Sequence, residues 1–336
     1  MPENENQKKV LLIATGGTIA TKITSNGLVP QMTSKEILEC IPEIAAICEV
    51  STIQLFNLDS TNICHTQWIQ VAACIQSHYH QYDAFVVTHG TDTMAYIAAA
   101  LSYMVQESPK PIVITGSQKS IYMKETDGRV NLLNAFYYAI SPYASGVHIV
   151  FDGKAILGTR ARKTRTKSYN AFSSIDYPET ARIRDGRVIP IAEEPYTNSF
   201  PKFYQNLNPS VFVLKLIPGI SAEIFTYLKE KYDAVIIESF GVGGIPSYGN
   251  NEFFRAIGDW IQSGKFLIMA TQVPHEGSDM AVYQVGYTIK EKYDLIESYD
   301  MTLEAVVAKT MWILGQTADR GIFREMFYRP VQKDIL

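Results

Sequence analysis

The sequence predicts a two-domain α/β protein whose sheets consist mainly of parallel strands. Its 336 residues are more than one hydrophobic core usually serves, which favours two domains. Short continuous runs of Val, Ile and Leu alternate with segments of helical periodicity, and the runs end abruptly in Gly, Ser, Thr or Asn. Such runs are typical of strands buried on both faces of a parallel sheet, with helices connecting them.

Six apolar runs are predicted to be buried strands, and four segments between or after them are predicted to be helices. The strands are expected at 10–14, 84–88, 111–115, 211–217, 234–238 and 266–271. The helices are expected at 66–80, 94–105, 130–139 and 303–314, where apolar residues recur at helical spacing. Residues 146–158 predict two strands that turn at Asp152-Gly153.

The rhythm of strand and helix breaks at residues 168–209, which are polar and rich in Pro and Tyr. We take this stretch as the candidate connection between domains, with the boundary near residue 205. The expected organisation is an N-terminal α/β domain over 1–190 with a flavodoxin-like parallel sheet, a linker over 191–210, and a smaller C-terminal α/β domain over 211–336.

Composition and charge exclude several classes of protein. Apolar residues make up 46% and charged residues 19%, which is ordinary for a soluble globular protein. No stretch approaches the roughly 18 apolar residues of a membrane helix, so no membrane partner is expected. The polar start, residues 1–9, lacks the apolar core and cleavage site of a signal peptide, which predicts a cytoplasmic location.

Metal and nucleic-acid binding are both disfavoured. The four cysteines show neither CxxC nor zinc-site spacing, so reduced thiols, no metal and no cofactor are expected; they are Cys40, Cys48, Cys64 and Cys74. The net charge of −4 argues against a general polyanion surface. Residues 160–167 carry five cations, which could contact phosphate, but a solvated or local anion-binding segment is favoured and nucleic acid is an unlikely partner.

Three predicted strands run into loops rich in glycine and hydroxyl groups: 15–18, 89–93 and 116–118. Carboxyl ends of parallel strands meet at one edge of a sheet, so we expect these loops to converge. Thr and Gly are also common turn residues, but their recurrence in several loops favours a functional cleft. Gly17 and Gly90 would let backbone amides approach a ligand or a developing oxyanion. Neither GxGxxG nor GxxxxGK[ST] occurs at these turns, which disfavours a nucleotide.

Thr91, Asp92 and a lysine-containing segment at 158–164 carry the candidate chemistry. A threonine hydroxyl is a poor nucleophile until a base accepts its proton. Lys163 could do so only when neutral, whereas Asp92 beside it would hold it charged and orient it. The sequence leaves both possibilities open. The motifs GxSxG and HExxH are absent, and His89 is expected to orient its loop rather than to catalyse.

Residues 15–20 (TGGTIA) and 89–94 (HGTDTM) resemble the two signature segments of bacterial-type L-asparaginases. The resemblance covers nearly the whole chain after residue 9, with further matches at 115–118, 127–135, 217–221 and 300–305. The lack of a signal peptide and the sequences of 27–30 and 59–61 are more similar to the cytoplasmic (type I) branch.

The resemblance implies hydrolysis of L-asparagine to L-aspartate and ammonia by double displacement, without a cofactor. Thr18 would be the nucleophile of the first loop, and Thr91, Asp92 and Lys163 would form a second triad. The substrate would be held by a second set of residues: Asp59, Ser60, Thr61, Gly17, Gly90 and Ser117. The family also implies a homodimer or homotetramer. Selectivity between asparagine and glutamine cannot be predicted, because the two differ by one methylene.

One departure from the family pattern keeps alternatives open. Many relatives place a tyrosine near the Thr18 hydroxyl, whereas residues 21–31 contain none and Leu28 stands at the expected place. Either another residue activates Thr18, or the Thr91 triad carries more of the chemistry, or the loop alignment is offset. A non-catalytic asparagine-binding sensor is therefore one alternative. A component of a tRNA-dependent amidotransferase is another, disfavoured because it is longer and carries an extra domain before the first signature.

Overall fold

The computed structural model describes residues 7–24, 27–192, 200–282, 287, 290, 292–293 and 295–336. The chain divides into two compact units, Met1–Gln205 and Asn206–Leu336. The division falls within the expected linker, of which residues 193–199 lie outside the described part, as do residues 1–6 of the polar start. The α/β class, with a larger N-terminal and a smaller C-terminal unit, agrees with the prediction.

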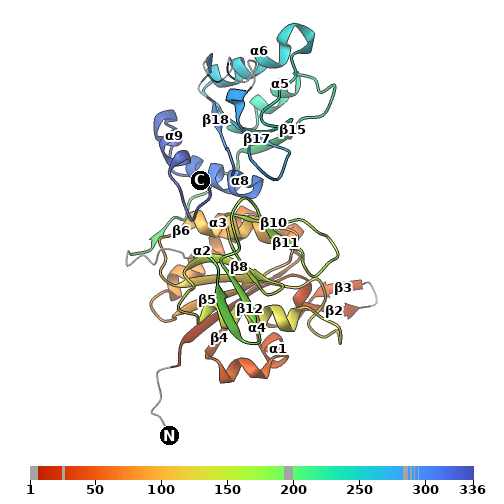
Figure 1. Ribbon diagram of the computed structural model, residues 1–336, viewed down its shortest axis with the longest axis vertical. Helices are drawn as coiled ribbons and strands as arrows, with labels where there is room; N and C mark the ends of the chain where they lie inside the picture. Colours follow the sequence, from red (N-terminus) through yellow and green to blue (C-terminus); the bar gives the residue numbers. More distant parts are fainter. Residues whose placement is uncertain are drawn as a thin grey trace. The chain divides into compact units, whose positions relative to one another are not determined.

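The larger unit is built on an eight-stranded sheet whose parallel part has the order β4-β1-β5-β7-β8. These strands are β1 (Lys9–Gly16), β4 (Glu49–Leu58), β5 (Ala84–Thr88), β7 (Pro111–Thr115) and β8 (Gly146–Phe151). Strands β4, β5 and β8 are labelled in Figure 1. Counted along the chain, the order is 2-1-3-4-5, which is the flavodoxin-like arrangement that the sequence predicted. In this arrangement ligands bind beyond the carboxyl ends of the first and third strands, here β1 and β5.

Three antiparallel strands extend this sheet beyond β8: β9 (Lys154–Leu157), β12 (Ala181–Arg184) and β13 (Arg187–Pro190). The predicted hairpin is confirmed, because β8 and β9 turn at Asp152 and Gly153, whose φ angles are 51° and 70°. Residues 168–209, the candidate connection, contain two strands, β12 and β13, that pair with the main sheet. β13 lies at the edge of the sheet and is largely exposed, which accounts for part of the polar sequence.

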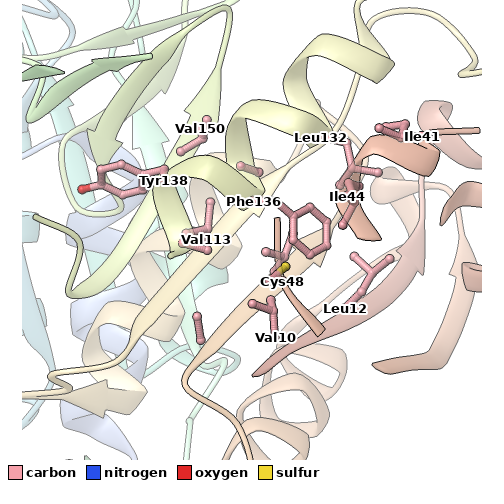
Figure 2. Packing of buried hydrophobic residues seen from close by; sticks show 14 of the residues in the cluster. Val10, Leu12, Ile41, Ile44, Cys48, Val113, Leu132, Phe136, Tyr138 and Val150 are labelled. Atoms are coloured by element: carbon pink, nitrogen blue, oxygen red, sulfur yellow. The ribbon is translucent and has the colours of Figure 1, made fainter. Parts of the chain in front are cut away.

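The helices of the larger unit begin and end within two residues of prediction. They are α2 (His65–His78), α3 (Met94–Met104) and α4 (Gly128–Ala139), to which α1 (Ser34–Glu39) is added. Leu132 and Phe136 of α4 pack toward Leu12 of β1 and toward Cys48 (Figure 2). Burial of apolar side chains on both faces of the sheet stabilises the fold and fixes the edge where the loops lie.

Short elements complete the larger unit. They are η1 (Thr18–Ala20), β2 (Thr21–Thr24), β3 (Gly27–Pro30), η2 (Pro42–Ala46), η3 (Ser60–Asn62), β6 (Val105–Gln106), β10 (Ala161–Lys163), β11 (Phe172–Ser174) and β14 (Lys202–Phe203). Leu28 lies in β3, but its side chain lies outside the described part, so the missing-tyrosine position stays a sequence observation.

The smaller unit contains a four-stranded parallel sheet of order β15-β16-β17-β18. Its elements are β15 (Val211–Lys215), α5 (Ile224–Lys229), β16 (Ala234–Ser239), α6 (Tyr248–Gln262), β17 (Phe266–Thr271), η4 (Met280–Val282), β18 (Ile296–Glu297), α8 (Leu303–Leu314) and α9 (Arg320–Tyr328). Lys309 of α8 forms a 2.7 Å ion pair with Asp334, and both side chains are fully buried. This pair fixes the C-terminal residues against α8.

Across the described residues, no helix is long and apolar enough to cross a membrane. All four cysteines are free thiols. A grouping of His, Cys, Asp and Glu side chains able to hold a metal ion is not found in the described part of the chain.

Candidate active site

The backbone of the loop after β1 lies against the backbone of the loop after β5. Gly17 has a φ of 78°, a conformation that favours glycine. A Cβ placed on Gly17 would lie 2.3 Å from the backbone nitrogen of Gly90, so no other residue fits. The hydroxyl of Thr15 donates to the carbonyl oxygen of Thr88 at 2.8 Å, which joins the two strands just before their loops. The predicted convergence of these loops is therefore present.

A third loop, after β4, closes against the same glycine. Ser60 is buried, and a Cβ placed on Gly90 would lie 2.7 Å from both Cβ and Oγ of Ser60. Thr93 Oγ1 donates to the carbonyl oxygen of Ser60 at 2.8 Å. Asp59 caps the short helix η3 by accepting hydrogen bonds from the Thr61 amide at 2.9 Å and from its hydroxyl at 2.7 Å. Gly17, Gly90 and Ser60 thus form one contact, with Asp59 and Thr61 exposed beside it.

Thr91, Asp92 and Lys163 are in direct contact. Lys163 Nζ lies 2.8 Å from Thr91 Oγ1 and 2.7 Å from Asp92 Oδ1. The Thr91 residue and the Lys163 side chain are largely buried, whereas the Asp92 side chain is 60% exposed. Asp92 therefore pairs with the lysine at the mouth of the site while Thr91 lies beneath it.

The path of the chain explains how Lys163 reaches Thr91 from 72 residues away. Strand β9 runs antiparallel to β8, so it carries the chain away from the edge where the loops lie. The chain then returns along α3: a Cβ placed on Gly158 would lie 2.7 Å from the Ala98 carbonyl oxygen and from Ser102 Oγ. Glycine at 158 and small side chains on α3 permit this close approach, and five residues later Lys163 lies beside the start of α3.

The loop after β7 supplies Gln118, which lies in the predicted loop 116–118 but was not among the predicted site residues. Its Oε1 lies 3.3 Å from Thr91 Oγ1, and its Nε2 donates to the carbonyl oxygens of Thr166 and Ser168 at 3.2 and 3.0 Å. The residue gave no sequence signal beyond its place in the loop, because an uncharged amide resembles an ordinary turn residue.

Asp127 and Ser117 hold this loop in shape. The Asp127 carboxylate accepts hydrogen bonds from the Gln118 amide at 2.8 and 3.1 Å and from the Lys119 amide at 3.0 Å. Burial raises the pKa of Asp127 above its ordinary value, and these amide hydrogen bonds oppose the change. Ser117 is fully buried, and its hydroxyl donates to the Lys119 carbonyl oxygen.

His89 orients its loop, as the sequence analysis expected. Its ring is fully buried, and desolvation lowers its pKa to about 4, so the imidazole is neutral at pH 7. Nδ1 lies 2.7 Å from the Gly90 carbonyl oxygen and donates to it, which assigns the proton to that nitrogen. The neutral ring therefore fixes the peptide that precedes Thr91.

Thr18 begins η1 directly after Gly17 and is partly exposed. Its carbonyl oxygen accepts a hydrogen bond from Thr21 Oγ1 at 2.7 Å. Within the described residues, its own hydroxyl makes no hydrogen bond, in contrast to the Thr91 hydroxyl. The two candidate threonines therefore differ: Thr91 has a lysine in contact, and Thr18 offers a hydroxyl without a described base.

The basic run at 160–167 does not form one cationic surface. Arg160 is fully buried, with its guanidinium 5.9 Å from the ring centroid of Tyr177. Lys163 points into the site described above, and Arg165 donates to the Asn170 carbonyl oxygen at 3.2 Å. The run therefore serves internal contacts to a large extent, which weakens the interpretation as a phosphate-binding face.

Comparisons with known proteins cover both units of the chain. Residues 9–196 match the family model "Asparaginase, N-terminal" and residues 210–327 match "Glutaminase/Asparaginase C-terminal domain". The chain is 34% identical to the L-asparaginase of Thermococcus kodakarensis, over 97% of this chain and 99% of that protein. The solved structure of the thermostable L-asparaginase from that organism superposes with a TM-score of 0.91, covering 98% of this chain and 99% of the other.

Two further relatives carry the names of two different enzymes, an asparaginase and an amidotransferase. L-asparaginase 1 of Escherichia coli K12 is 30% identical, over 98% of each chain. One component of the glutamyl-tRNA(Gln) amidotransferase of Pyrococcus abyssi is 31% identical over 95% of this chain, but over only 74% of that protein.

Proposed function

This chain belongs to the asparaginase family, and from that membership we propose that it hydrolyses the side-chain amide of L-asparagine to L-aspartate and ammonia. It is an amidohydrolase. The observation that carries the proposal is the Thr91 hydroxyl held 2.8 Å from Lys163 Nζ, with Asp92 Oδ1 2.7 Å from the same nitrogen. A hydroxyl nucleophile with an amine in contact and a carboxylate to orient that amine is what amide hydrolysis by a side-chain nucleophile requires.

The reaction consists of two displacements. A threonine oxygen attacks the amide carbon, the carbon–nitrogen bond breaks, and the nitrogen leaves as ammonia with the proton that the hydroxyl gave up. Water then attacks the resulting ester, one proton of that water passes to the threonine oxygen, and aspartate leaves. The Thr91–Lys163 contact supports proton transfer at Thr91, with Asp92 keeping the lysine in place. Thr18 is the second nucleophile candidate.

The substrate's charged groups and its reacting oxygen need separate partners. We assign the α-amino and α-carboxylate groups to the loop of Asp59, Ser60 and Thr61, where exposed polar side chains lie beside the Gly17–Gly90 contact. Backbone amides next to Gly17 and Gly90 suit the developing oxyanion, because glycine leaves them open to close approach. Ser117, whose side chain is buried in the loop after β7, is the remaining member of the proposed substrate-binding set.

The proposal is tested by ammonia release from L-asparagine, from L-glutamine and from buffer alone, using purified protein. Thr91→Val should lower kcat by about 10³-fold or more, since it removes an interaction of the transition state. Thr226→Val, which makes the same change at an exposed position of α5, is the matched control and should retain full activity. Turnover near the wild-type value in Thr91→Val would contradict the second triad.

Two other outcomes would point to the alternatives. A folded wild-type protein that binds asparagine by calorimetry, yet releases no ammonia, would identify a sensor. Ammonia release only in the presence of glutamyl-tRNA(Gln) would support the amidotransferase alternative. The 31% identity to the Pyrococcus abyssi protein is the reason to test for it. Release from asparagine by the protein alone supports a free hydrolase.

We also propose a cytoplasmic location and assembly as a homodimer or homotetramer, as the family resemblance implies. Light scattering coupled to size-exclusion chromatography measures the assembly directly against the monomer mass of 37.7 kDa.

A further inference from the structure

The side-chain amide of Gln118 has its two ends bonded to different parts of the site. Nε2 carries two hydrogens, and both are directed at carbonyl oxygens, those of Thr166 at 3.2 Å and Ser168 at 3.0 Å. The oxygen end must therefore face the other way, toward Thr91 Oγ1 at 3.3 Å. The contacts themselves thus assign the orientation of the amide.

This orientation dictates where the Thr91 proton points. Lys163 Nζ donates to Thr91 Oγ1 at 2.8 Å, so this oxygen accepts its hydrogen bond from the lysine. The single hydrogen of the Thr91 hydroxyl is then left for Gln118 Oε1. With its proton toward Gln118 and one lone pair engaged by Lys163, the Thr91 oxygen keeps one lone pair for attack on a substrate carbon.

The length of the Thr91–Gln118 contact suits a directing role. At 3.3 Å it is longer than the roughly 2.5–3.0 Å that is usual for O–H···O hydrogen bonds. A weak bond orients the hydroxyl in the resting enzyme at little cost when the proton has to move to another acceptor. An uncharged amide is also a poor base, so Gln118 directs the proton without removing it.

The nitrogen end of the amide contacts the segment that follows Lys163. Thr166 and Ser168 follow Lys163 by three and five residues, in the segment that joins β10 to β11. Through these two carbonyl contacts Gln118 ties the strand that carries the lysine to the loop after β7. Asp127 Oδ2 in turn accepts a hydrogen bond from the Gln118 backbone amide at 2.8 Å, which holds the Gln118 backbone in place.

We propose that Gln118 is a positioning residue that sets the separation and the hydrogen-bond direction of the Thr91–Lys163 pair. The inference deepens the proposed function and rests on it. The amide does this with both ends at once: the oxygen directs the Thr91 hydroxyl, and the nitrogen holds the segment after Lys163.

Two substitutions of Gln118 distinguish the role of its amide oxygen from the role of its amide nitrogen. Gln118→Met keeps the length of the side chain and removes all three contacts. Gln118→Glu keeps an oxygen for Thr91 but places a second oxygen against the carbonyls of Thr166 and Ser168, which breaks the tie. Gln205→Met is the matched control, because it removes a glutamine that donates to Gln76 Oε1 on α2 and contacts none of these residues. Each variant is assayed for kcat and KM with L-asparagine, and its folded fraction is measured by circular dichroism.

Both Gln118 variants should lower kcat about 10- to 100-fold per folded molecule, as loss of alignment at reacting atoms does, with KM within about threefold of wild type. Gln205→Met should match wild type in both constants. Wild-type kcat in Gln118→Met would overturn the inference. Wild-type kcat in Gln118→Glu would overturn the two-ended role, since one acceptor oxygen would then suffice.

Two further outcomes would also overturn it: a parallel change in kcat and KM, or failure of both Gln118 variants to fold while Gln205→Met folds. Either would leave Gln118 with a purely structural role. Failure of the inference is distinguishable from failure of the proposed function. In the first case the wild-type protein releases ammonia and the variants do so equally well, and in the second the wild-type protein itself releases none.

Discussion

Adding one methyl group at residue 90 tests the contact on which the site depends. In Gly90→Ala the new Cβ would lie 2.7 Å from the Ser60 Cβ and 3.2 Å from the Gly17 Cα. Non-bonded carbons settle at about 3.5–4.0 Å, so the loops after β4 and β5 must separate by roughly 1 Å. A displacement of about 1 Å can cost roughly 10²-fold in rate. We therefore expect kcat/KM for L-asparagine to fall about 100-fold, with about 1–3 kcal/mol of destabilisation from overpacking.

The measurement combines steady-state ammonia release with urea unfolding. Gly264→Ala is the control, since a Cβ there meets no atom within 4 Å and any strain arises only from its φ of 88°. It should keep the wild-type kcat/KM. The double variant Gly90→Ala/Ser60→Gly removes the opposing Cβ, so its kcat should exceed that of Gly90→Ala. A folded Gly90→Ala enzyme with kcat/KM within threefold of wild type would refute the argument that the loops must touch.

Two further predictions concern stability. Lys309→Met removes the cation that pairs with the buried Asp334 carboxylate and should lower the free energy of unfolding, measured in urea, by about 3–5 kcal/mol. The double variant Lys309→Met/Asp334→Leu should recover most of this lost stability. A loss below about 1 kcal/mol in Lys309→Met would contradict the prediction. Burial lowers the pKa of His89 to about 4 and of His148 to about 3, from the ordinary 6.5. The unfolded chain therefore binds more protons than the folded chain as the pH falls below about 6.5, and stability should fall by roughly 1.4 kcal/mol per pH unit for each histidine, down to about pH 4 for His89. Unfolding between pH 7.5 and 4.5 should show a shallower slope in His148→Leu, and equal slopes would show that this ring does not contribute.

The parallel part of the larger sheet could be predicted because its strands are buried on both faces. Strands β5 and β7 coincide with their apolar runs, and α8 with its periodic segment. Strand β4 was missed because it lies at the edge of the sheet, where partly exposed positions admit Ser51, Thr52 and Gln54. Pattern analysis detects complete burial, and an edge strand lacks it.

The residues of the site also fall into a group that could be predicted from the sequence and a group that could not. Hydroxyl and glycine loops at strand ends predicted which segments would meet, because the topology of parallel sheets fixes where their ends lie. Gln118 could not be predicted, since its partners Thr166 and Ser168 are backbone carbonyls 48 and 50 residues away in a segment without a period. A side chain whose role is to orient another one carries no charge or spacing that marks it in a sequence.

Helix α3 fixes both halves of the Thr91–Lys163 pair. Thr91 lies just before its first turn, and the chain that leads to Lys163 runs along its flank, in contact at Gly158. A displacement of this helix would therefore move the hydroxyl and the amine in the same direction, so α3 adds to the restraint that Gln118 places on their separation.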